Sequence, residues 1–543
     1  MALFCGGGGP WVRLGGMMCH VRAARAAWIG ILAAVVSQFL APAAWGETAR
    51  GTVFEDRNGN GVRDAGERGL AGVRVSNQRD IVVTDREGRW ELPAEDDMVF
   101  FVIKPRGYMP PLNEHLLPRF FYIHKPAGSP AHLKHPGVAP TGPLPASIDF
   151  PLRRQREPRR FQAVFMGDTQ PRDIREVGYF RDSVVPELVG TDAAFGVTLG
   201  DVVFDDLSVF EPHNAAVALI GIPWWNVIGN HDHNYDVPND RDADEAFTRV
   251  YGPNYYSFDY GPVHFIALDD VEWGGAKPEG TGTYTAGLDA RQLEFVRNDL
   301  ALVPDSQLVV LMMHIPLTSV GNRGELYRLI EKRRYALSIS GHTHWHEHRF
   351  ITQEDGWLGP EPHHHIVTVT ACGSWWTGAP GPNGIPHATM RDGAPNGYAV
   401  LTFDRQRASV RFKAAGQPAS KQMNVMLPGN PSAAAAGAGW LYVNVFDGSE
   451  RSVVEYRLGR RGPWVALDQV REHDPSYVAR KAAEEANPPP IPPFRKMGDP
   501  INSPHLWKAA LPRLSEGEHR VEVRTRDLEG RVHRERHTLV VGP

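Results

Sequence analysis

VFMGDTQ at residues 164–170 is the stretch that decides the fold: a short apolar run stops at a glycine and passes directly into polar side chains. Buried strands of a layered α/β fold end in this way, and ligands collect at their carboxyl ends. The pattern recurs farther along the chain in VTLGD (197–201), NVIGNHD (226–232), VVLMMHIP (309–316) and SISGHTH (338–344). We therefore expect a central layered α/β domain with polar residues gathered at one edge of its sheets.

The polar residues at these strand ends are of the types that bind divalent metals. They are Asp168, Gln170, Asp201, Asn230, His314, His342 and His344. Hydrolysis of a phosphoester requires water to attack an anion, and two metal ions about 3.5–4 Å apart ionise that water and neutralise the phosphate oxygens. Such a site needs a carboxylate that bridges both ions and about three further ligands for each ion. The sequence therefore predicts a binuclear metal site in a metallohydrolase.

The same segments resemble the motifs of the calcineurin-like metallophosphoesterase family, which run DxH, GD, GNH[DE], H and GHxH. In this chain they stand, in the family's order, as GDTQ (167–170), GD (200–201), GNHD (229–232), MHIP (313–316) and GHTH (341–344). The resemblance implies an α/β/β/α sandwich and a metal-dependent phosphoric ester hydrolase. The substrate would be a phosphomonoester or a phosphodiester, attacked by a hydroxide that bridges the metals.

The resemblance also assigns a role to each position. Asp168, Gln170, Asp201 and His344 would bind the first metal, and Asp201 would bridge to the second, which Asn230, His314 and His342 would complete. His231 would contact the leaving group as general acid, and Asp232 would orient its imidazole. The alternative is that these are ordinary capping and turn residues at strand ends. Five motifs in the right order argue against that alternative.

One position departs from the family pattern, because Gln170 stands where the first motif has histidine. If the glutamine oxygen replaces the imidazole nitrogen, the first metal site gains a harder donor atom. Such a site favours Mn²⁺, Fe²⁺ or Mg²⁺ over Zn²⁺. We expect two divalent transition metals, with manganese as the first choice and Fe, Zn or Mg as the others. The alternative is weakened binding, which would leave a weak or inactive secreted binding or scaffold protein with this fold. We favour the active enzyme because every other ligand is present.

The catalytic domain is expected over residues 157–426, between two β-sandwich modules at 47–156 and 440–543. The stretch 427–439, LPGNPSAAAAGAG, is typical of a linker. The flanking modules resemble those of exported bacterial calcineurin-like phosphoesterases. Within the catalytic domain, LDARQLEFVRNDLALV (288–303) predicts a helix capped by Asp289.

The first module contains a second candidate metal site. Residues 56–67, DRNGNGVRDAGE, match the spacing of a calcium-binding loop. The oxygen ligands would be Asp56, Asn58, Asn60, the Val62 carbonyl, Asp64 and Glu67. The alternative is an Asn/Gly/Asp turn that binds no ion.

Residues 1–46 have the pattern of an export signal. Arg13, Arg22 and Arg25 precede an apolar stretch at 26–44, and small residues follow it. A retained membrane anchor is disfavoured because the apolar run is short and interrupted. We therefore expect a periplasmic or secreted protein with no membrane span after processing.

The net charge limits the classes of molecule that the protein is expected to bind, and the cysteine content limits how disulfides could stabilise it. The net charge is −5, from 58 basic and 63 acidic residues, and no basic patch indicates nucleic acid. The expected partner is a small-molecule, glycan or lipid phosphoester. Cys5 and Cys19 fall in the signal, which leaves Cys372 alone and allows no intrachain disulfide.

Several conspicuous residues lie outside the motifs. His346, His348 and the cluster at 363–365 are interpreted as structural or exposed histidines. Trp375 and Trp376 would wall a substrate cleft or would be buried in a packed loop.

Overall fold

The computed structural model describes residues 47–276, 282–429, 431–435 and 437–543. The predicted export signal, with Cys5 and Cys19, lies outside the described residues. Among the residues that are described, no helix is long and apolar enough to cross a membrane.

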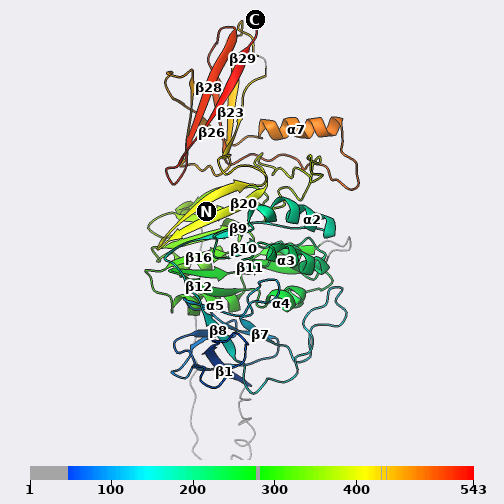
Figure 1. Cartoon of the computed structure of the whole chain (residues 1–543), viewed down its shortest axis with the longest axis vertical. Helices are drawn as coiled ribbons and strands as arrows, with labels where there is room; N and C mark the ends of the chain where they lie inside the picture. The colour runs from blue at the N-terminus through cyan, green and yellow to red at the C-terminus, as the bar shows by residue number, and fades with distance from the viewer. Residues whose placement is uncertain (1–46, 277–281, 430, 436) are drawn as a thin grey trace, which may run out of the picture. The chain divides into compact units, whose positions relative to one another are not determined.

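Two sheets pack face to face at the centre of the chain (Figure 1). The first has the order β11-β10-β9-β20-β21, in which β9, β10 and β11 are parallel. Its strands are β9 (Arg160–Met166), β10 (Gly196–Leu199), β11 (Trp224–Val227), β20 (Gly397–Asp404) and β21 (Arg407–Ala414). The second has the order β12-β13-β16-β17-β19-β18, with four parallel strands between antiparallel edges. Its strands are β12 (Tyr256–Tyr260), β13 (Val263–Ala267), β16 (Leu308–Met312), β17 (Ala336–Ser340), β18 (Glu347–Ile351) and β19 (His363–Val367).

The period-two pattern of β9 explains how the layers stack. Ala163 and Phe165 point into the core between the sheets, whereas Val164 and Met166 point into the core under the helices. Between the sheets, aromatic rings interlock, as where Trp225 stacks on Phe258 at 4.1 Å between ring centroids.

Helices cover the outer faces of both sheets and complete the α/β/β/α sandwich that the sequence predicts. They are α2 (Ile174–Ser183), α3 (Phe210–Ala218), α4 (Glu245–Tyr251), α5 (Ala290–Leu300) and α6 (Arg323–Ile330). Short 3₁₀ turns lie at Val185–Glu187, Leu207–Val209, Asn230–Asp232, Asp240–Asp242, Leu317–Ser319 and Gln353–Asp355, and β14 (Val271–Ala276) pairs with β15 (Gly282–Ala286). The predicted helix is α5, where the Asp289 side chain accepts a hydrogen bond from the Gln292 backbone N–H at 2.6 Å.

The N-terminal module is a sandwich of two four-stranded sheets, ordered β4-β1-β8-β6 and β3-β2-β5-β7. Its strands are β1 (Thr48–Glu55), β2 (Arg74–Ser76), β3 (Ile81–Val83), β4 (Arg89–Pro93), β5 (Met98–Val102), β6 (Tyr108–Met109), β7 (Phe121–His124) and β8 (Phe150–Arg154). Trp90 packs between Phe100 and Phe150 in its core.

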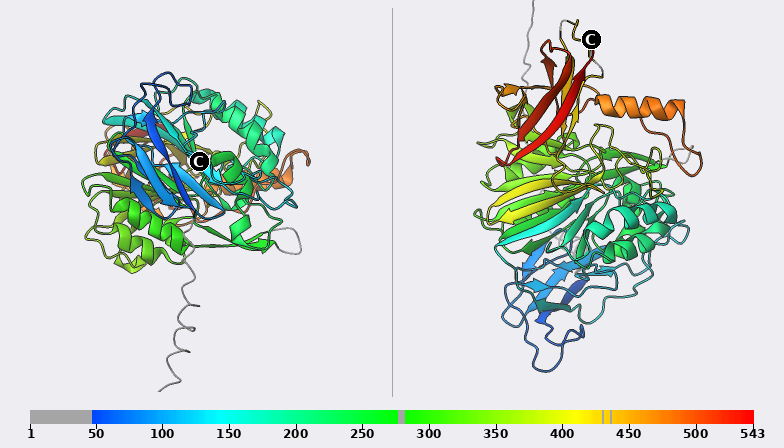
Figure 2. Two further views of the ribbon diagram at one scale, coloured as in Figure 1. Left: turned by 90° about the horizontal axis from the view of Figure 1, so that it is seen from below. Right: turned by 45° about the horizontal axis from the view of Figure 1, so that its top comes forward.

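The C-terminal module is also a two-sheet sandwich, ordered β22-β23-β27-β26 and β25-β24-β28-β29 (Figure 2). Its strands are β22 (Met423–Met426), β23 (Gly439–Val445), β24 (Val453–Leu458), β25 (Val465–Ala466), β26 (Asp468–Val470), β27 (Leu506–Leu511), β28 (Gly517–Arg526) and β29 (Val532–Val541). Helix α7 (Pro475–Ala486) lies between β26 and β27 in the sequence.

The structure corrects one predicted boundary. Strand β22 pairs with β23 along its whole length, so the C-terminal module begins before residue 427. The stretch 427–439 connects two neighbouring strands of one sheet and is not a linker between domains. Its Pro, Gly and Ala content is suited to a turn as well as to a linker, and only the strand pairing distinguishes the two.

A buried ion pair joins the N-terminal module to the catalytic domain. Lys104 Nζ donates to Glu157 Oε1 and to the Asp259 carbonyl, both at 2.6 Å, and the side chains of the pair are 1% exposed. The second Glu157 oxygen accepts from the backbone N–H groups of Gly107 and Gly261. Hydrogen bonds from protein groups therefore replace the hydration of both charges.

Replacement of Lys104 by methionine should leave the Glu157 carboxylate buried and unpaired, which costs about 3 kcal/mol in the free energy of unfolding. The double variant Lys104→Met/Glu157→Leu should be destabilised by less than either single variant. Denaturant unfolding followed by tryptophan fluorescence measures both. Arg50→Met, which removes an exposed pair with Glu91, is the control and should change little. Equal losses for Lys104→Met and Arg50→Met would contradict the assignment.

Candidate metal centre

The structure brings all seven predicted metal ligands to the carboxyl ends of five strands. They follow β9 (Asp168 and Gln170), β10 (Asp201), β11 (Asn230), β16 (His314) and β17 (His342 and His344). Six of these side chains are buried and His342 is partly exposed. Because β16 and β17 belong to one sheet and the other three strands to its partner, the site lies where the edges of the two sheets meet.

The residues predicted for the second metal converge on one atom. His314 Nε2 lies 3.0 Å from Asn230 Oδ1, 3.1 Å from His342 Nδ1 and 3.2 Å from Asp201 Oδ1. The other ring nitrogen of His314 donates to the Leu199 carbonyl at 2.8 Å. That hydrogen bond keeps a proton on Nδ1, so Nε2 is the ring nitrogen that would bind a metal after losing its own proton.

Asp168 and His344 are the central pair among the residues predicted to bind the first metal, which we call the first set. His344 Nε2 lies 3.5 Å from Asp168 Oδ1, and His344 Nδ1 donates to the Gly373 carbonyl. Asp168 Oδ1 is buried and has no hydrogen-bond partner among the described residues. An unpaired buried carboxylate oxygen is costly unless it faces a cation.

Gln170 lies beside this set. Its Nε2 donates to Asp201 Oδ2 at 2.8 Å, and its Oε1 accepts from Cys372 Sγ at 3.7 Å. Rotation of the amide by half a turn would present the oxygen to the metal site and the nitrogen to the sulfur, which is a weak acceptor. The place of Gln170 therefore agrees with the predicted role, and its ligation through oxygen stays a prediction.

Several residues of the site have positive φ angles, a backbone conformation that residues other than glycine rarely adopt. Positive φ angles occur at five of the seven residues: Asp168 (38°), Gln170 (40°), Asp201 (48°), His342 (72°) and His344 (58°). Such strain clusters at functional sites, where the surrounding structure fixes the geometry. The glycines of the motifs are needed for close approach, since a Cβ at Gly200 would lie 2.3 Å from His314 Nδ1 and one at Gly229 would lie 2.1 Å from the Asp201 nitrogen.

The protonation states agree with a site for a dication. Burial raises the pKa of Asp168 to about 8, and the neighbouring Asp201 adds to that effect. Burial also opposes ionisation of Asp201, but His314 holds the pKa of that carboxyl below its usual range. Burial works against the charged form of His314, but Asp201 and Asp168 raise the pKa of this imidazole to about 10, so it is charged until a metal displaces its Nε2 proton. Burial lowers the pKa of His342 to about 3 and that of His344 to about 4, so both imidazoles are neutral. Neutral imidazoles and crowded carboxylates are the donors that a divalent metal stabilises.

His231 lies next to this cluster and is oriented by a residue that the sequence analysis missed. Its Nδ1 contacts Asp205 Oδ1 at 2.5 Å and the Tyr235 hydroxyl at 3.1 Å, and its ring stacks on Phe204. We expected Asp232 in this role. The only early signal for Asp205 is an acidic residue four positions after the GD motif.

The Asp232 carboxylate has a different function. It accepts hydrogen bonds from the backbone N–H groups of Val202, Val203 and Gly229 at 2.9–3.1 Å. These bonds join the turn after β10 to the turn after β11. Asp232 therefore fixes the loops that carry Asp201 and Asn230, and it does not orient the imidazole.

The two tryptophans have different surroundings. Trp375 packs on the His344 ring at 4.2 Å between centroids. Trp376 is buried, and its indole N–H donates to the Thr169 carbonyl. Trp375 thus supports a ligand histidine, while Trp376 is part of the core beneath the first motif.

Of the other histidines singled out in the sequence, His346, His348, His363 and His365 are buried and His364 is half-buried. His363 and His365 share hydrogen bonds with Ser338 between neighbouring strands, which confirms a structural role. His346 and His348 are also buried, and both contact Asp447. The alternative that these histidines are exposed is therefore wrong.

The side chains of the calcium-type loop (56–67) form hydrogen bonds with other groups of the same loop. Asp56 accepts from the backbone N–H groups of Gly59 and Gly61, and Glu67 accepts from those of Arg57 and Asp64. Asp64 accepts from the side-chain amides of Asn58 and Asn60 at 2.7 and 2.8 Å. All five predicted side-chain ligands thus take part in hydrogen bonds within this loop. Its turn glycine, Gly61, has a φ angle of +75°.

Three family models match the chain. They are "N terminal of Calcineurin-like phosphoesterase" over residues 57–135, "Calcineurin-like phosphoesterase" over 163–346 and "C terminal of Calcineurin-like phosphoesterase" over 365–533. The catalytic model includes all seven predicted metal ligands. The third model begins inside the catalytic domain, because it includes β20 and β21 of the first sheet.

Two solved structures show a distant similarity. One is the purple acid phosphatase PPD1 from yellow lupin (Lupinus luteus) seeds, with a TM-score of 0.34 and 14% identity over 68% of this chain and 66% of that chain. The other is CopC from Methylosinus trichosporium OB3b, with a TM-score of 0.13 and 14% identity over 22% of this chain and 95% of that chain. The search of curated proteins finds no match.

The family assignment rests on the three models, which match in chain order, and on the five metal motifs inside the second of them. The chain belongs to the calcineurin-like phosphoesterase family, whose members are metal-dependent phosphoric ester hydrolases.

Proposed function

We propose that this chain is an active phosphoesterase with two metals that is exported to the periplasm or the cell exterior. It hydrolyses a phosphomonoester or phosphodiester of a small molecule, a glycan or a lipid headgroup. The observation that carries the proposal is the convergence of His314 Nε2, His342 Nδ1, Asn230 Oδ1 and Asp201 Oδ1 beside the pair Asp168 and His344. No other buried cluster among the described residues contains so many donors of this kind on strand ends.

In this proposal Asp201 is the bridging ligand. Its Oδ1 faces His314 Nε2 of the second set at 3.2 Å, and its Oδ2 faces the Gln170 amide of the first set at 2.8 Å. The two oxygens of one carboxylate thus point to the two halves of the site. Metals bound there would supply charge neutralisation for the phosphate and activation of the attacking water.

His231 is suited to donate a proton to the leaving oxygen. Burial works against its charged form, but the carboxylates of Asp201 and Asp205 raise its pKa overall. The Asp205 contact holds the proton on Nδ1, and a stack on Phe204 fixes the plane of the ring. Such an imidazolium is a general acid at near-neutral pH.

The His231 assignment is tested with the purified chain loaded with Mn²⁺, on p-nitrophenyl phosphate and bis-p-nitrophenyl phosphate. His231→Ala should lower kcat by about 100-fold or more on the substrate that the enzyme prefers. Asp205→Asn should lower kcat about 10-fold, because the imidazole loses its orienting carboxylate. The control is His519→Ala, a partly exposed histidine in β28.

Metal content measured on the same samples should equal that of the unmodified chain, because neither variant removes a predicted metal ligand. Unchanged kcat for His231→Ala would overturn its assignment as general acid. A chain that binds two ions and hydrolyses neither substrate would favour the alternative of a secreted binding or scaffold protein.

Gln170→His tests whether position 170 binds metal through its side chain. An imidazole there should keep hydrolysis and shift the preferred ion from Mn²⁺ towards Zn²⁺, because nitrogen is the softer donor. The measurement is kcat after reconstitution with each ion in turn. Gln170→Leu, similar in size but without a donor, should bind one ion fewer per chain than the unmodified protein. If it binds as many ions as the unmodified protein, Gln170 does not bind metal.

Calcium in the loop 56–67 would rigidify the N-terminal module, since Cys372 is buried and free among the described residues and provides no cross-link. Calcium should raise the melting temperature, by an amount equivalent to about 2.7 kcal/mol at 100 times its Kd. Glu67→Gln should abolish this calcium-dependent rise, and Glu87→Gln, on an exposed turn of the same module, should keep it. An equal rise in both variants would assign the calcium to another site.

A further inference from the structure

A second group of ligand-type side chains lies between the catalytic domain and the C-terminal module. His346 and His348 continue the last metal motif as GHTHWHEH (341–348), and Asp447 follows β23 of the C-terminal module. The three side chains are 0%, 1% and 8% exposed. They come from two parts of the chain that are about 100 residues apart and meet in the folded protein.

The geometry of this group is that of metal ligands. His346 Nε2 and His348 Nε2 lie 3.1 and 2.9 Å from the same oxygen, Asp447 Oδ1. The two rings stand at 84° to one another, and all three ligand atoms lie within 4.8 Å. Bonds of about 2.0–2.1 Å to a tetrahedral zinc place ligand atoms roughly 3.3 Å apart, close to the spacing seen here.

The neighbouring arginine does not compete with the two imidazoles for Asp447 Oδ1. Arg531 approaches the other carboxylate oxygen, Oδ2, at 3.5 Å. His348 Nδ1 lies 2.9 Å from His364 Nε2, so a proton on Nδ1 has an acceptor when Nε2 binds a metal. His346 Nδ1 has no partner among the described residues and does not distinguish the two tautomers.

Two buried carboxylates flank His346. Asp447 contacts its ring, and Asp392 accepts a hydrogen bond from its backbone N–H at 3.0 Å. Asp392 also has a partner of its own, because His505 Nε2 lies 2.9 Å from its Oδ2. A dication held by the two imidazoles would therefore face the carboxylate of Asp447.

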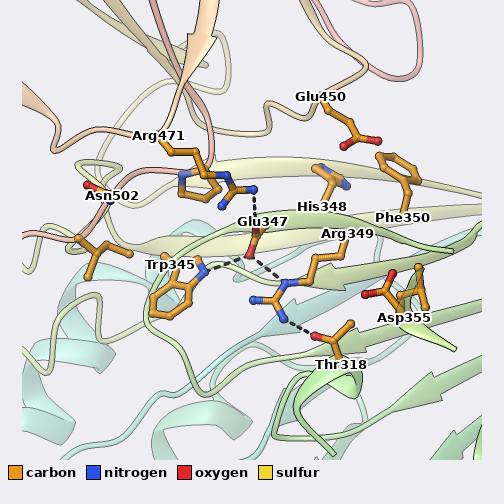
Figure 3. A pocket seen from close by; sticks show the side chains of 13 residues that line it. Thr318, Trp345, Glu347, His348, Arg349, Phe350, Asp355, Glu450, Arg471 and Asn502 are labelled. Carbon is orange, nitrogen blue, oxygen red and sulfur yellow. Dashed lines mark hydrogen bonds and ion pairs between the residues drawn. The ribbon is translucent and has the colours of Figure 1, made fainter. Parts of the chain in front are cut away.

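A cavity of about 500 Å³ adjoins the group, and His348 is one of its lining residues, which come from both parts of the chain (Figure 3). In Figure 3 His348 lies on the wall near Glu450 of the C-terminal module. A water molecule from this cavity would serve as the fourth ligand.

We infer that His346, His348 and Asp447 form a third transition-metal site, which suits Zn²⁺ and ties the C-terminal module to the catalytic domain. This site is separate from the proposed catalytic pair. It shares no ligand with that pair, although His346 is two residues from His344. Its role is structural, because all three protein ligands are buried between two packed modules.

The test counts ions in the full chain. The protein is stripped with a chelator, reloaded with Zn²⁺ in calcium-free buffer and analysed by mass spectrometry of metals. The double variant Asp168→Asn/Asp201→Asn should lose the catalytic ions and keep one Zn²⁺ per chain. Addition of Asp447→Asn or His348→Gln should remove that last ion. Addition of His363→Gln, which changes another buried histidine, should leave it in place.

Reloading with Co²⁺ gives a readout that does not depend on turnover. A tetrahedral site should give strong visible absorption in the Asp168→Asn/Asp201→Asn chain, and this absorption should be lost with Asp447→Asn. No ion in that background, or an ion that persists in Asp447→Asn, overturns the proposal.

If the double variant does not fold, Asp447→Asn in the otherwise unmodified chain decides the case: the loss of one ion supports the site, and an unchanged ion count overturns it. Failure of the catalytic pair alone gives a different result. It leaves one ion that depends on Asp447 and not on Asp201.

Discussion

Two buried carboxylates in one cluster, Asp168 and Asp201, are the constraint on which the rest of the structure depends. Burial of a charge is tolerated only where opposite charge and hydrogen bonds offset its lost hydration. The fold meets this need by ending five strands of two packed sheets at the same place, so that three imidazoles and two amides surround the carboxylates. The positive φ angles at both aspartates show that the backbone is bent to point them inward. The aromatic core between the sheets supplies the rigidity that holds such angles.

Much of this arrangement is visible in the sequence because the signals are local. An apolar run that breaks into Gly-Asp or Gly-Asn predicts both a strand and the ligand at its end, and α5 is predicted by its Asp289 cap and apolar spacing. The partner of His231 was not predictable in this way. Asp205 and His231 are 26 residues apart, and the turn after β10 decides whether Asp205 or Asp232 faces the ring. Strand β22 was missed because a four-residue strand is defined by its pairing with β23 and not by its composition.

The C-terminal module contributes to the metal centre although it supplies none of the seven predicted ligands. Arg495, in the segment after α7, donates to Glu176 of α2 at 2.6 Å and to the Trp375 carbonyl. Trp375 in turn packs on the ring of His344. A displacement of this module would therefore loosen the support of a predicted metal ligand.

The donor atoms also differ between the two halves of the proposed catalytic site. The second half has two imidazole nitrogens, from His314 and His342, and two oxygens, from Asn230 and Asp201. With Gln170 bound through oxygen, the first half has three oxygens and the single imidazole of His344. Hard ions prefer the first set, and a borderline ion such as zinc prefers the second. One glutamine in place of histidine thus makes the two halves chemically unequal, and this inequality is the physical reason to expect manganese or iron beside the bridging carboxylate.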